Sequence, residues 1–263
     1  MRLVPSPVRA AAAELGLAIA QPERIRDSAS VARIEELAPE LIVVVAYGQI
    51  IPRSILALPP GGIVNVHASL LPRHRGAAPI AHAILAGDAV TGVTIMRMDE
   101  LLDHGPLLEF EKVPVGARET APELTGRLAA VGARLLAGTV DHLDLVLPVA
   151  QDHARATMAP RLRKEDGWLR WEMSAVEIDR RVRALQPWPG TTVAFRGRMV
   201  KVIAGTPVDG EGEPGSVLGR SREGPAVATG AGAYRLATVQ LPGRGAMPGN
   251  QLLSLPDAGE SDA

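Results

Sequence analysis

The chain has 263 residues, no cysteine and a formal net charge of −1 at pH 7. The lack of cysteine excludes disulfides, thiol nucleophiles and thiolate metal sites, and the near-zero charge argues against a globally basic nucleic-acid-binding protein. Apolar residues make up 46% of the sequence and charged residues 22%, which is typical of a folded chain with a real core. At roughly 150 residues per domain, the length suggests about two domains.

No segment of the sequence has the pattern of a membrane span or a targeting signal. The most apolar stretch, residues 41–46, is far shorter than the about 20 residues that a spanning helix needs. The N-terminus also lacks the apolar stretch of a signal peptide. We therefore expect a soluble, cytoplasmic protein without membrane contacts.

Helical and strand patterns alternate through the first half of the chain, which predicts βα units and a mostly parallel, Rossmann-like sheet. The β-branched stretch at 41–48 is typical of a strand buried on both faces of such a sheet. The other elements predicted for this half are helices at 8–15, 30–37, 79–86 and 122–145 and strands at 62–69, 92–98 and 106–113.

Two polar residues alternate with apolar ones in the predicted strand at 62–69. Asn65 and His67 are two positions apart, so their side chains leave the same face of the strand and can meet at one site. The loop that follows has the sequence SLLPRHRGAAPI and leaves the carboxyl end of the strand, where open α/β sheets bind ligands. Its Arg73 and Arg75 favour an anionic ligand, although exposed loop arginines without a ligand are also common.

Asp103 lies in the sequence LLDHGP, a predicted turn between two strands. Taken alone it is most simply a turn aspartate. Next to an Asn-x-His pair, however, it indicates a catalytic role. An aspartate raises the basicity of a histidine, a histidine transfers a proton near neutral pH, and an asparagine amide donates a hydrogen bond to an oxyanion. Those are the groups needed for acyl transfer to an amine without a covalent nucleophile.

The second half of the chain changes in character after a connector at 148–160, which has weak periodicity. A helix at 174–185 is followed by short strand patterns, which predict a small β-barrel-like (OB-like) domain. The expected strands are 191–195, 198–204, 215–218, 225–229 and 233–240. The sequence thus predicts a catalytic domain at 1–147, a linker at 148–160, a second domain at 161–254 and a frayed tail at 255–263.

Three further patterns in the sequence carry weaker chemical signals. Gly210, Gly212 and Gly215 formally match G-x-G-x-x-G, but they open no helix and lie among acidic residues, which argues against a dinucleotide site. The six histidines form no metal motif, so no metal is expected. Residues 161–201 hold ten Arg or Lys against five Asp or Glu, which fits either a phosphate-contacting surface or an ordinary solvated helix face.

The motifs around these residues resemble those of the folate-dependent formyltransferases. The sequence NVHASLLP at 65–72 is followed by RHRGAAPI at 73–80, then by GVTIMRMD and the Asp-x-Gly-Pro element at Asp103. RHRGAAPI, KEDG at 164–167 and VRALQPWPG at 182–190 point within that group to the methionyl-tRNA formyltransferases. The resemblance extends from about Leu3 to Gln240.

The resemblance implies formyl transfer from 10-formyltetrahydrofolate to the amino group of methionyl initiator tRNA, in translation initiation. It assigns catalysis to Asn65, His67 and Asp103, and it makes residues 161–201 a tRNA-contacting surface of the second domain. It requires no metal, and we expect a monomer. The residues that would line the folate pocket are Ser69, Leu70, Leu71 and Pro72.

The sequence departs from the family pattern at its N-terminus and beside Asp103. Its first recognisable segment resembles the part that follows an opening strand–helix–strand unit and a basic loop, so about 40 residues of the pattern are expected to be absent. That predicts an incomplete sheet with an unpaired edge. Leu101 stands where the family usually has Gly, and His104 where Thr is common. Two alternatives stay open: a folate-dependent formyltransferase for another small amine, and an inactive truncated tRNA- or folate-binding remnant.

Overall fold

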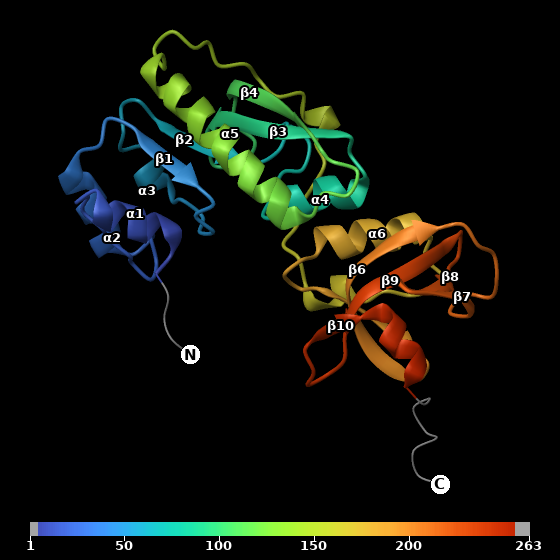
Figure 1. Cartoon of the computed structure of the whole chain (residues 1–263). Helices are drawn as coiled ribbons and strands as arrows, with labels where there is room; N and C mark the ends of the chain where they lie inside the picture. The colour runs from blue at the N-terminus through green and yellow to red at the C-terminus, as the bar shows by residue number, and fades with distance from the viewer. Residues whose placement is uncertain (1–4, 256–263) are drawn as a thin grey trace. The chain divides into compact units, whose positions relative to one another are not determined.

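The computed structural model of the protein describes residues 5–255 (Figure 1). Within that range the chain forms two compact units. One comprises the residues up to 42 together with 47–63, and the other comprises 43–46 together with 64–255. The predicted tail at 255–263 falls outside the described residues apart from Leu255. None of the helices in residues 5–255 is both long and apolar enough to cross a lipid bilayer.

The first unit contains three helices, α1 (Pro7–Glu14), α2 (Ser28–Leu37) and α3 (Arg53–Leu56). The predictions of the first two are confirmed. Helix α1 begins where the hydroxyl of Ser6 accepts the backbone N–H of Arg9, and α2 ends at Ala38 in the left-handed conformation. Helix α3 is a single turn that the sequence pattern did not predict, because one turn is too short to show a helical period.

The first sheet has the strand order β1-β2-β3-β4. Its strands are β1 (Ile42–Val45), β2 (Ile63–His67), β3 (Val90–Arg97) and β4 (Leu107–Pro114). The N–H of Gly61 binds the carbonyl of Glu40, and the N–H of Ile42 binds the carbonyl of Gly62. The partners advance together along both segments, so β1 and β2 start side by side and run in the same direction. The pairs β2–β3 and β3–β4 are antiparallel. The mixed α/β class is confirmed, but the described sheet is parallel at only one of its three strand pairs.

Strand β1 forms an edge of the described sheet. Val43 and Val45 are 40% and 57% exposed, so the prediction of a strand buried on both faces is wrong. Its β-branched sequence would suit an interior strand, yet within residues 5–255 β2 is the only strand in the sheet order beside it. The expected open sheet edge is therefore seen at β1.

Two helices accompany this sheet, α4 (Pro79–Ala86) and α5 (Ala121–Asp141). Helix α5 begins with a capping box between Thr120 and Glu123, and it packs on β3 and β4 (Figure 1). At Gly132 it lies close to β2 and β3, since an added Cβ there would lie 3.1 Å from Val66 Cγ1 and 3.5 Å from Val93 Cγ1. Val66 therefore faces α5. Because side chains alternate along a strand, Asn65 and His67 lie on the opposite face.

The remainder of the chain forms an antiparallel sheet with helix α6 (Ala175–Ala184). Its strand order is β5-β6-β9-β8-β7, and β10 pairs with β9. The predicted strands are confirmed in number and order, but β7 starts two and ends three residues later than expected, β6 is longer, and β10 was not predicted. The bounds are β5 Thr191–Phe195, β6 Arg198–Val208, β7 Val217–Ser221, β8 Gly224–Ala228, β9 Ala233–Gln240 and β10 Ala246–Pro248. Three 3₁₀ helices, His153–Arg155, Lys164–Gly167 and Gly249–Ser254, complete the described chain.

The core of this second sheet is built from β-branched and aromatic residues that leave one face of the strands. Val193, Val200 and Val227 pack there with Tyr234 and with Ile178 of α6. Trp171 meets Phe195 edge to face and donates its indole N–H to the carbonyl of Ala194. Within residues 5–255, β5 and β7 lie at opposite ends of the strand order and do not pair with each other. Closure into a barrel therefore stays a prediction.

Candidate active site

His67 ends β2 and is 5% exposed. Its Nε2 lies 3.0 Å from the backbone carbonyl of His74, and a carbonyl oxygen can only accept a hydrogen bond. The neutral ring therefore carries its proton on Nε2 and donates it to that carbonyl. This leaves Nδ1 as the basic nitrogen.

Nδ1 of His67 lies 3.7 Å from Oδ2 of Asp103. The prediction that the imidazole and the carboxylate meet is confirmed. The distance is longer than a hydrogen bond, which fits a ring whose Nδ1 is unprotonated. A proton accepted at Nδ1 would give the imidazolium two acceptors, the Asp103 carboxylate and the His74 carbonyl.

Asp103 is held by the loop that follows β2. The backbone N–H of Gly76 donates to Oδ2 of Asp103 over 2.7 Å. Asp103 itself has φ +46°, a left-handed conformation that aspartate adopts more readily than most residues. Its backbone direction aims the carboxylate toward β2 rather than out of the turn.

Burial is the largest influence on His67 and lowers the pKa of its imidazole below the usual 6.5. The His74 imidazole lowers it further, whereas the Asp103 carboxylate and the hydrogen bond to the His74 carbonyl raise it. The net lowering keeps the ring neutral near pH 7. His67 thus has the protonation state of a general base, with a negative charge beside it to stabilise the proton once accepted.

Asn65 shares the strand face of His67 and is partly exposed. Across the antiparallel pair Asn65 lies opposite Met96, and His67 lies opposite Thr94. The hydroxyl of Thr94 donates to the carbonyl of Ser69 over 2.7 Å and fixes the first residue of the loop. The strand therefore presents an amide and an imidazole side by side at the point where the loop begins.

Of the four residues expected to line a folate pocket, two are buried and two are partly exposed. Ser69 and Leu71 are buried, and the Ser69 hydroxyl donates to the carbonyl of Arg73 over 2.6 Å. Leu70 and Pro72 are partly exposed. A ligand on this loop would therefore meet Leu70 and Pro72, while the Ser69 hydroxyl is used to shape the loop.

Comparison with known proteins identifies the family to which the chain belongs. The sequence matches the family described as formyl transferase over residues 3–140 and the formyl transferase C-terminal domain over residues 161–255. The methionyl-tRNA formyltransferase of Acidiphilium cryptum is 47% identical over 253 residues, which cover 96% of this chain and 82% of the relative. The chain belongs to the formyl transferase family.

Two solved structures of low sequence identity share the fold of this formyl transferase. One is HypX from Aquifex aeolicus in complex with tetrahydrofolic acid, with a TM-score of 0.64 and 20% identity over 85% of this chain and 40% of that one. The other is WlaRD, a sugar 3N-formyl transferase, with a TM-score of 0.66 and 16% identity over 89% of this chain and 80% of that one. The predicted fold class is thereby confirmed.

The two loop arginines of the formyl transferase do not act alike. Arg73 is exposed and forms an ion pair with Asp88 over 2.6 Å. Arg75 is 7% exposed and binds Gln151 and His153. The expectation that both arginines favour an anionic ligand is wrong for Arg75, because its guanidinium is already enclosed by partners inside the protein.

Sequence reasoning missed several residues that hold the site together. Asp88 binds Nε2 of His74 over 2.6 Å and thereby steadies the residue whose carbonyl sets the tautomer of His67. Gln151 binds the backbone of the Asp103 turn. Neither belongs to a recognisable motif, and each acts from a distant position in the sequence. Their role follows only from the folded structure.

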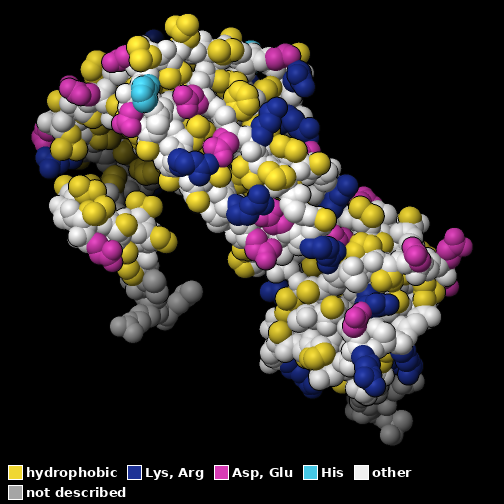
Figure 2. Space-filling model, turned by 45° about the horizontal axis from the view of Figure 1, so that its top comes forward, with side chains coloured by type: hydrophobic (Ala, Val, Ile, Leu, Met, Phe, Trp, Pro, Cys, Tyr) yellow, Lys and Arg dark blue, Asp and Glu magenta, His cyan; other side chains and the backbone are white. Residues whose placement is uncertain are grey.

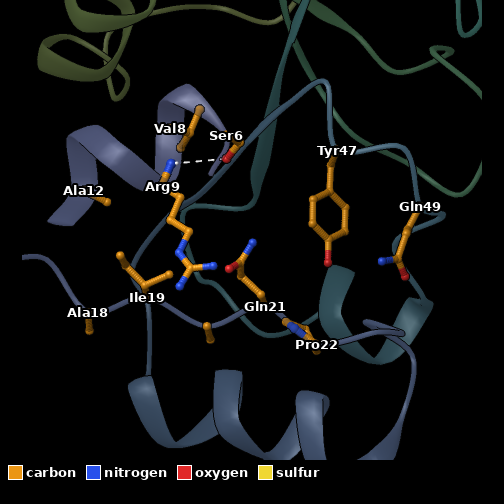
Figure 3. A pocket seen from close by; sticks show the side chains of 11 residues that line it. Ser6, Val8, Arg9, Ala12, Ala18, Ile19, Gln21, Pro22, Tyr47 and Gln49 are labelled. Atoms are coloured by element: carbon orange, nitrogen blue, oxygen red, sulfur yellow. Dashed lines mark hydrogen bonds between the residues drawn. The ribbon is translucent and has the colours of Figure 1, made fainter. Parts of the chain in front are cut away.

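A hollow of about 390 Å³ lies in the N-terminal unit and includes none of the predicted site residues. Arg9 and Gln21 point toward one another within it, and Tyr47 and Gln49 stand at its other side (Figure 3). Residues 5–255 contain no group of three His, Asp or Glu side chains suited to hold a metal ion. The arrangement around His67 is thus the best-built candidate site in the described chain.

Proposed function

We propose that the protein transfers the formyl group of 10-formyltetrahydrofolate to the amino group of methionyl initiator tRNA. The observation that carries the proposal is the buried His67, which is held as a single neutral tautomer beside the Asp103 carboxylate. The family uses a folate-derived formyl donor, and the relative that shares 47% of its residues carries the name of this activity.

In the proposed reaction the methionyl amine attacks the formyl carbon. The C–N bond to methionine forms, the carbonyl π electrons move to the oxygen, and a tetrahedral oxyanion results. His67 takes a proton from the attacking nitrogen at Nδ1, where Asp103 stabilises the imidazolium. Collapse of the oxyanion breaks the bond to N10 of the folate, and the same proton goes to N10. The products are the formamide and tetrahydrofolate, and the protein ends unchanged.

Asn65 is proposed to donate its amide N–H to the oxyanion. The residue lies on the same strand face as His67, so one bound formyl group can meet both side chains. A donor fixed on a β-strand needs little rearrangement as the negative charge develops, which is the basis of oxyanion stabilisation. Of the four residues assigned to the folate pocket, Leu70 and Pro72 are proposed to contact the folate, while the buried Ser69 and Leu71 hold the loop in shape.

The tRNA-contacting surface is proposed to include the exposed basic residues at the start of the second domain. Arg161, Arg163, Lys164 and Arg170 are all exposed. By contrast, Arg183 is partly buried and paired with Asp179. In the view of Figure 2, Lys and Arg side chains are interspersed with acidic ones. We therefore restrict the proposed phosphate contacts to the four exposed residues, since neutralised arginines add little to phosphate binding.

For this function we propose a catalytic part at 1–147, a connector at 148–160 and a tRNA-binding part at 161–254.

The alternative is a different acceptor amine, such as that of an amino sugar. WlaRD, a sugar 3N-formyl transferase, shows that this fold carries such a reaction. The name of the 47% identical relative favours the tRNA, because the sugar enzyme shares only 16% of its residues with this chain.

The test is to incubate the purified chain with 10-formyltetrahydrofolate and either methionyl initiator tRNA or an amino-sugar nucleotide. Formylmethionyl-tRNA alone is the expected product. Formylation of the sugar instead would favour the alternative acceptor. Tetrahydrofolate binding without any product would favour an inactive remnant.

A further inference from the structure

The connector at 148–160 is bonded to both segments that form the active site. Val149 exchanges two backbone hydrogen bonds of 2.8 Å with Leu107, the first residue of β4. Ala159 donates to the carbonyl of Arg75 over 2.6 Å and accepts the N–H of Ala78 over 3.1 Å. This segment therefore spans from the strand after the Asp103 turn to the loop after β2, and it does not behave as a free linker.

Gln151 lies in the middle of this connector and is 5% exposed. Its side-chain Nε2 donates to the carbonyl of Asp103 over 2.9 Å and to the carbonyl of Gly105 over 2.7 Å. The two carbonyls lie on either side of His104. Because Asp103 has a positive φ, its backbone needs such contacts to keep the carboxylate aimed at His67.

The other end of the Gln151 amide is fixed as well. Its Oε1 accepts from Nε of Arg75 over 3.2 Å and from Nη2 over 2.5 Å. A guanidinium only donates and a backbone carbonyl only accepts, so just one orientation of the amide satisfies all four bonds. Glutamine fits because it carries a donor and an acceptor on one planar group. Glutamate would satisfy Arg75 but would place an oxygen against two carbonyl oxygens.

A second contact joins the connector to the same turn. Nδ1 of His153 lies 2.8 Å from Nη2 of Arg75, and the His153 ring stacks on that of His104 at 4.0 Å and 7°. His104 follows Asp103 directly, and its Nδ1 binds Asp99 over 2.7 Å. The turn is thus held at Asp103 and Gly105 by Gln151 and at His104 by ring stacking.

We propose that Gln151 is a positioning residue for the reaction, acting through the backbone of Asp103 to hold its carboxylate beside His67. The role rests on the proposed function for its catalytic consequence, whereas its structural consequence can be measured without any substrate. Gln151 touches no reacting atom, and its effect comes from the geometry of the turn.

Two substitutions test the role, Gln151→Ala and Gln151→Glu. The second keeps an acceptor for Arg75 and so preserves the connector, while it removes both donors to the turn. The matched control is Gln240→Ala, which removes a comparable amide-to-carbonyl bond, from Gln240 to Arg244 (2.7 Å), in the second sheet. For each protein we would measure the thermal midpoint, kcat and KM in formyl transfer, and the pKa of His67 by NMR on labelled histidine, assigned with His67→Ala.

The expected result for Gln151→Glu is a lowered thermal midpoint, because two buried carbonyls lose their donor, together with an unchanged KM and, per folded molecule, a kcat reduced by about 100-fold, the scale of a misplaced catalytic group. The pKa of His67 should move further down. The groups that face this ring are Asp103 and His74. The Asp103 carboxylate and the hydrogen bond to the His74 carbonyl both raise the pKa, so a carboxylate that moves away from the ring lowers it. The control should change none of these quantities.

Wild-type kcat together with an unmoved His67 pKa in Gln151→Glu would overturn the role, even if Gln151→Ala failed to fold. If the wild-type chain formylates no tRNA but the His67 pKa moves in Gln151→Glu, the proposed function fails and the positioning role stands. If kcat falls only in proportion to the fraction of folded protein, with an unmoved His67 pKa, the role is structural and the proposal is wrong.

Discussion

Nδ1 of His67 lies 3.7 Å from Oδ2 of Asp103, and the same oxygen accepts the backbone N–H of Gly76. Because of this arrangement, the neutral and the protonated ring of His67 have different numbers of hydrogen-bond partners. The neutral ring has one hydrogen-bond partner, the His74 carbonyl, and the imidazolium gains a second in Asp103. Burial opposes the charge, so the site holds an unprotonated base that is prepared to stabilise a proton briefly.

The pKa of His67 should lie below 6.5, because burial outweighs the attraction of Asp103. With its pKa lowered in this way, His67 of the folded protein binds a proton only at a lower pH than a free histidine does. The basic form of the ring therefore persists as the pH falls to 6.5 and is lost below it. NMR titration measures this directly, whereas the substrate α-amine, with a pKa of about 7.7–8.0, would mask it in a rate profile. A pKa above 6.5 would show that Asp103 dominates over burial.

Asp103→Asn should lower kcat by about 100-fold with little change in stability. The asparagine oxygen can still accept the N–H of Gly76, so the turn keeps its bond, but the negative charge beside the imidazolium is gone. The His67 pKa should fall further than in the wild type. Asp144→Asn, at an exposed position after α5, is the control for removing one carboxylate. Equal rates for the two variants would deny Asp103 a role in the chemistry.

Asn65→Asp should reduce kcat by about 100- to 1,000-fold, the usual cost of losing one oxyanion donor. The change keeps the shape of the side chain but replaces the amide N–H by a negative oxygen, which repels the developing oxyanion. The pKa of His67 should rise, since a new carboxylate would lie on the same strand face. Steady-state kinetics and the NMR titration together check both effects. A fall in folate affinity with kcat intact would instead make Asn65 a binding residue.

Gly105→Ala should destabilise the protein by about 1–3 kcal/mol, because the added methyl would overlap the carbonyl of Arg97. Gly126→Ala is the matched control: Gly126 lies in α5, where an added Cβ meets nothing within 4 Å. That variant should gain about 0.5–1 kcal/mol from helix propensity. Urea unfolding measures both free energies. Similar values for the two variants would show that the turn at Gly105 relaxes easily.

The sequence alone was enough to predict the strand that carries the catalytic pair. Asn65 and His67 alternate with apolar residues, and alternation in a strand determines which face each side chain takes. Asp103 was recognisable only beside the Asn-x-His motif, since an isolated aspartate in a turn is common.

The contacts that position Asp103 could not be predicted in this way. Gln151 lies 48 positions away from Asp103, and nothing in its neighbours distinguishes it from other polar residues of a connector. The exposure of β1 could not be predicted either, for a different reason. A β-branched stretch indicates a preference for burial, but whether the faces of the strand are covered depends on which elements pack on the sheet, and the local sequence does not show this.

The central claim is that His67 takes the proton from the attacking amine, and a single-turnover rate of formyl transfer tests it most directly. Wild-type protein and His67→Ala would be compared with both substrates saturating, with His142→Ala, an exposed histidine after α5, as the control. The account predicts a rate about two to four orders of magnitude lower for His67→Ala and an unchanged rate for His142→Ala. Equal rates for wild type and His67→Ala would contradict it.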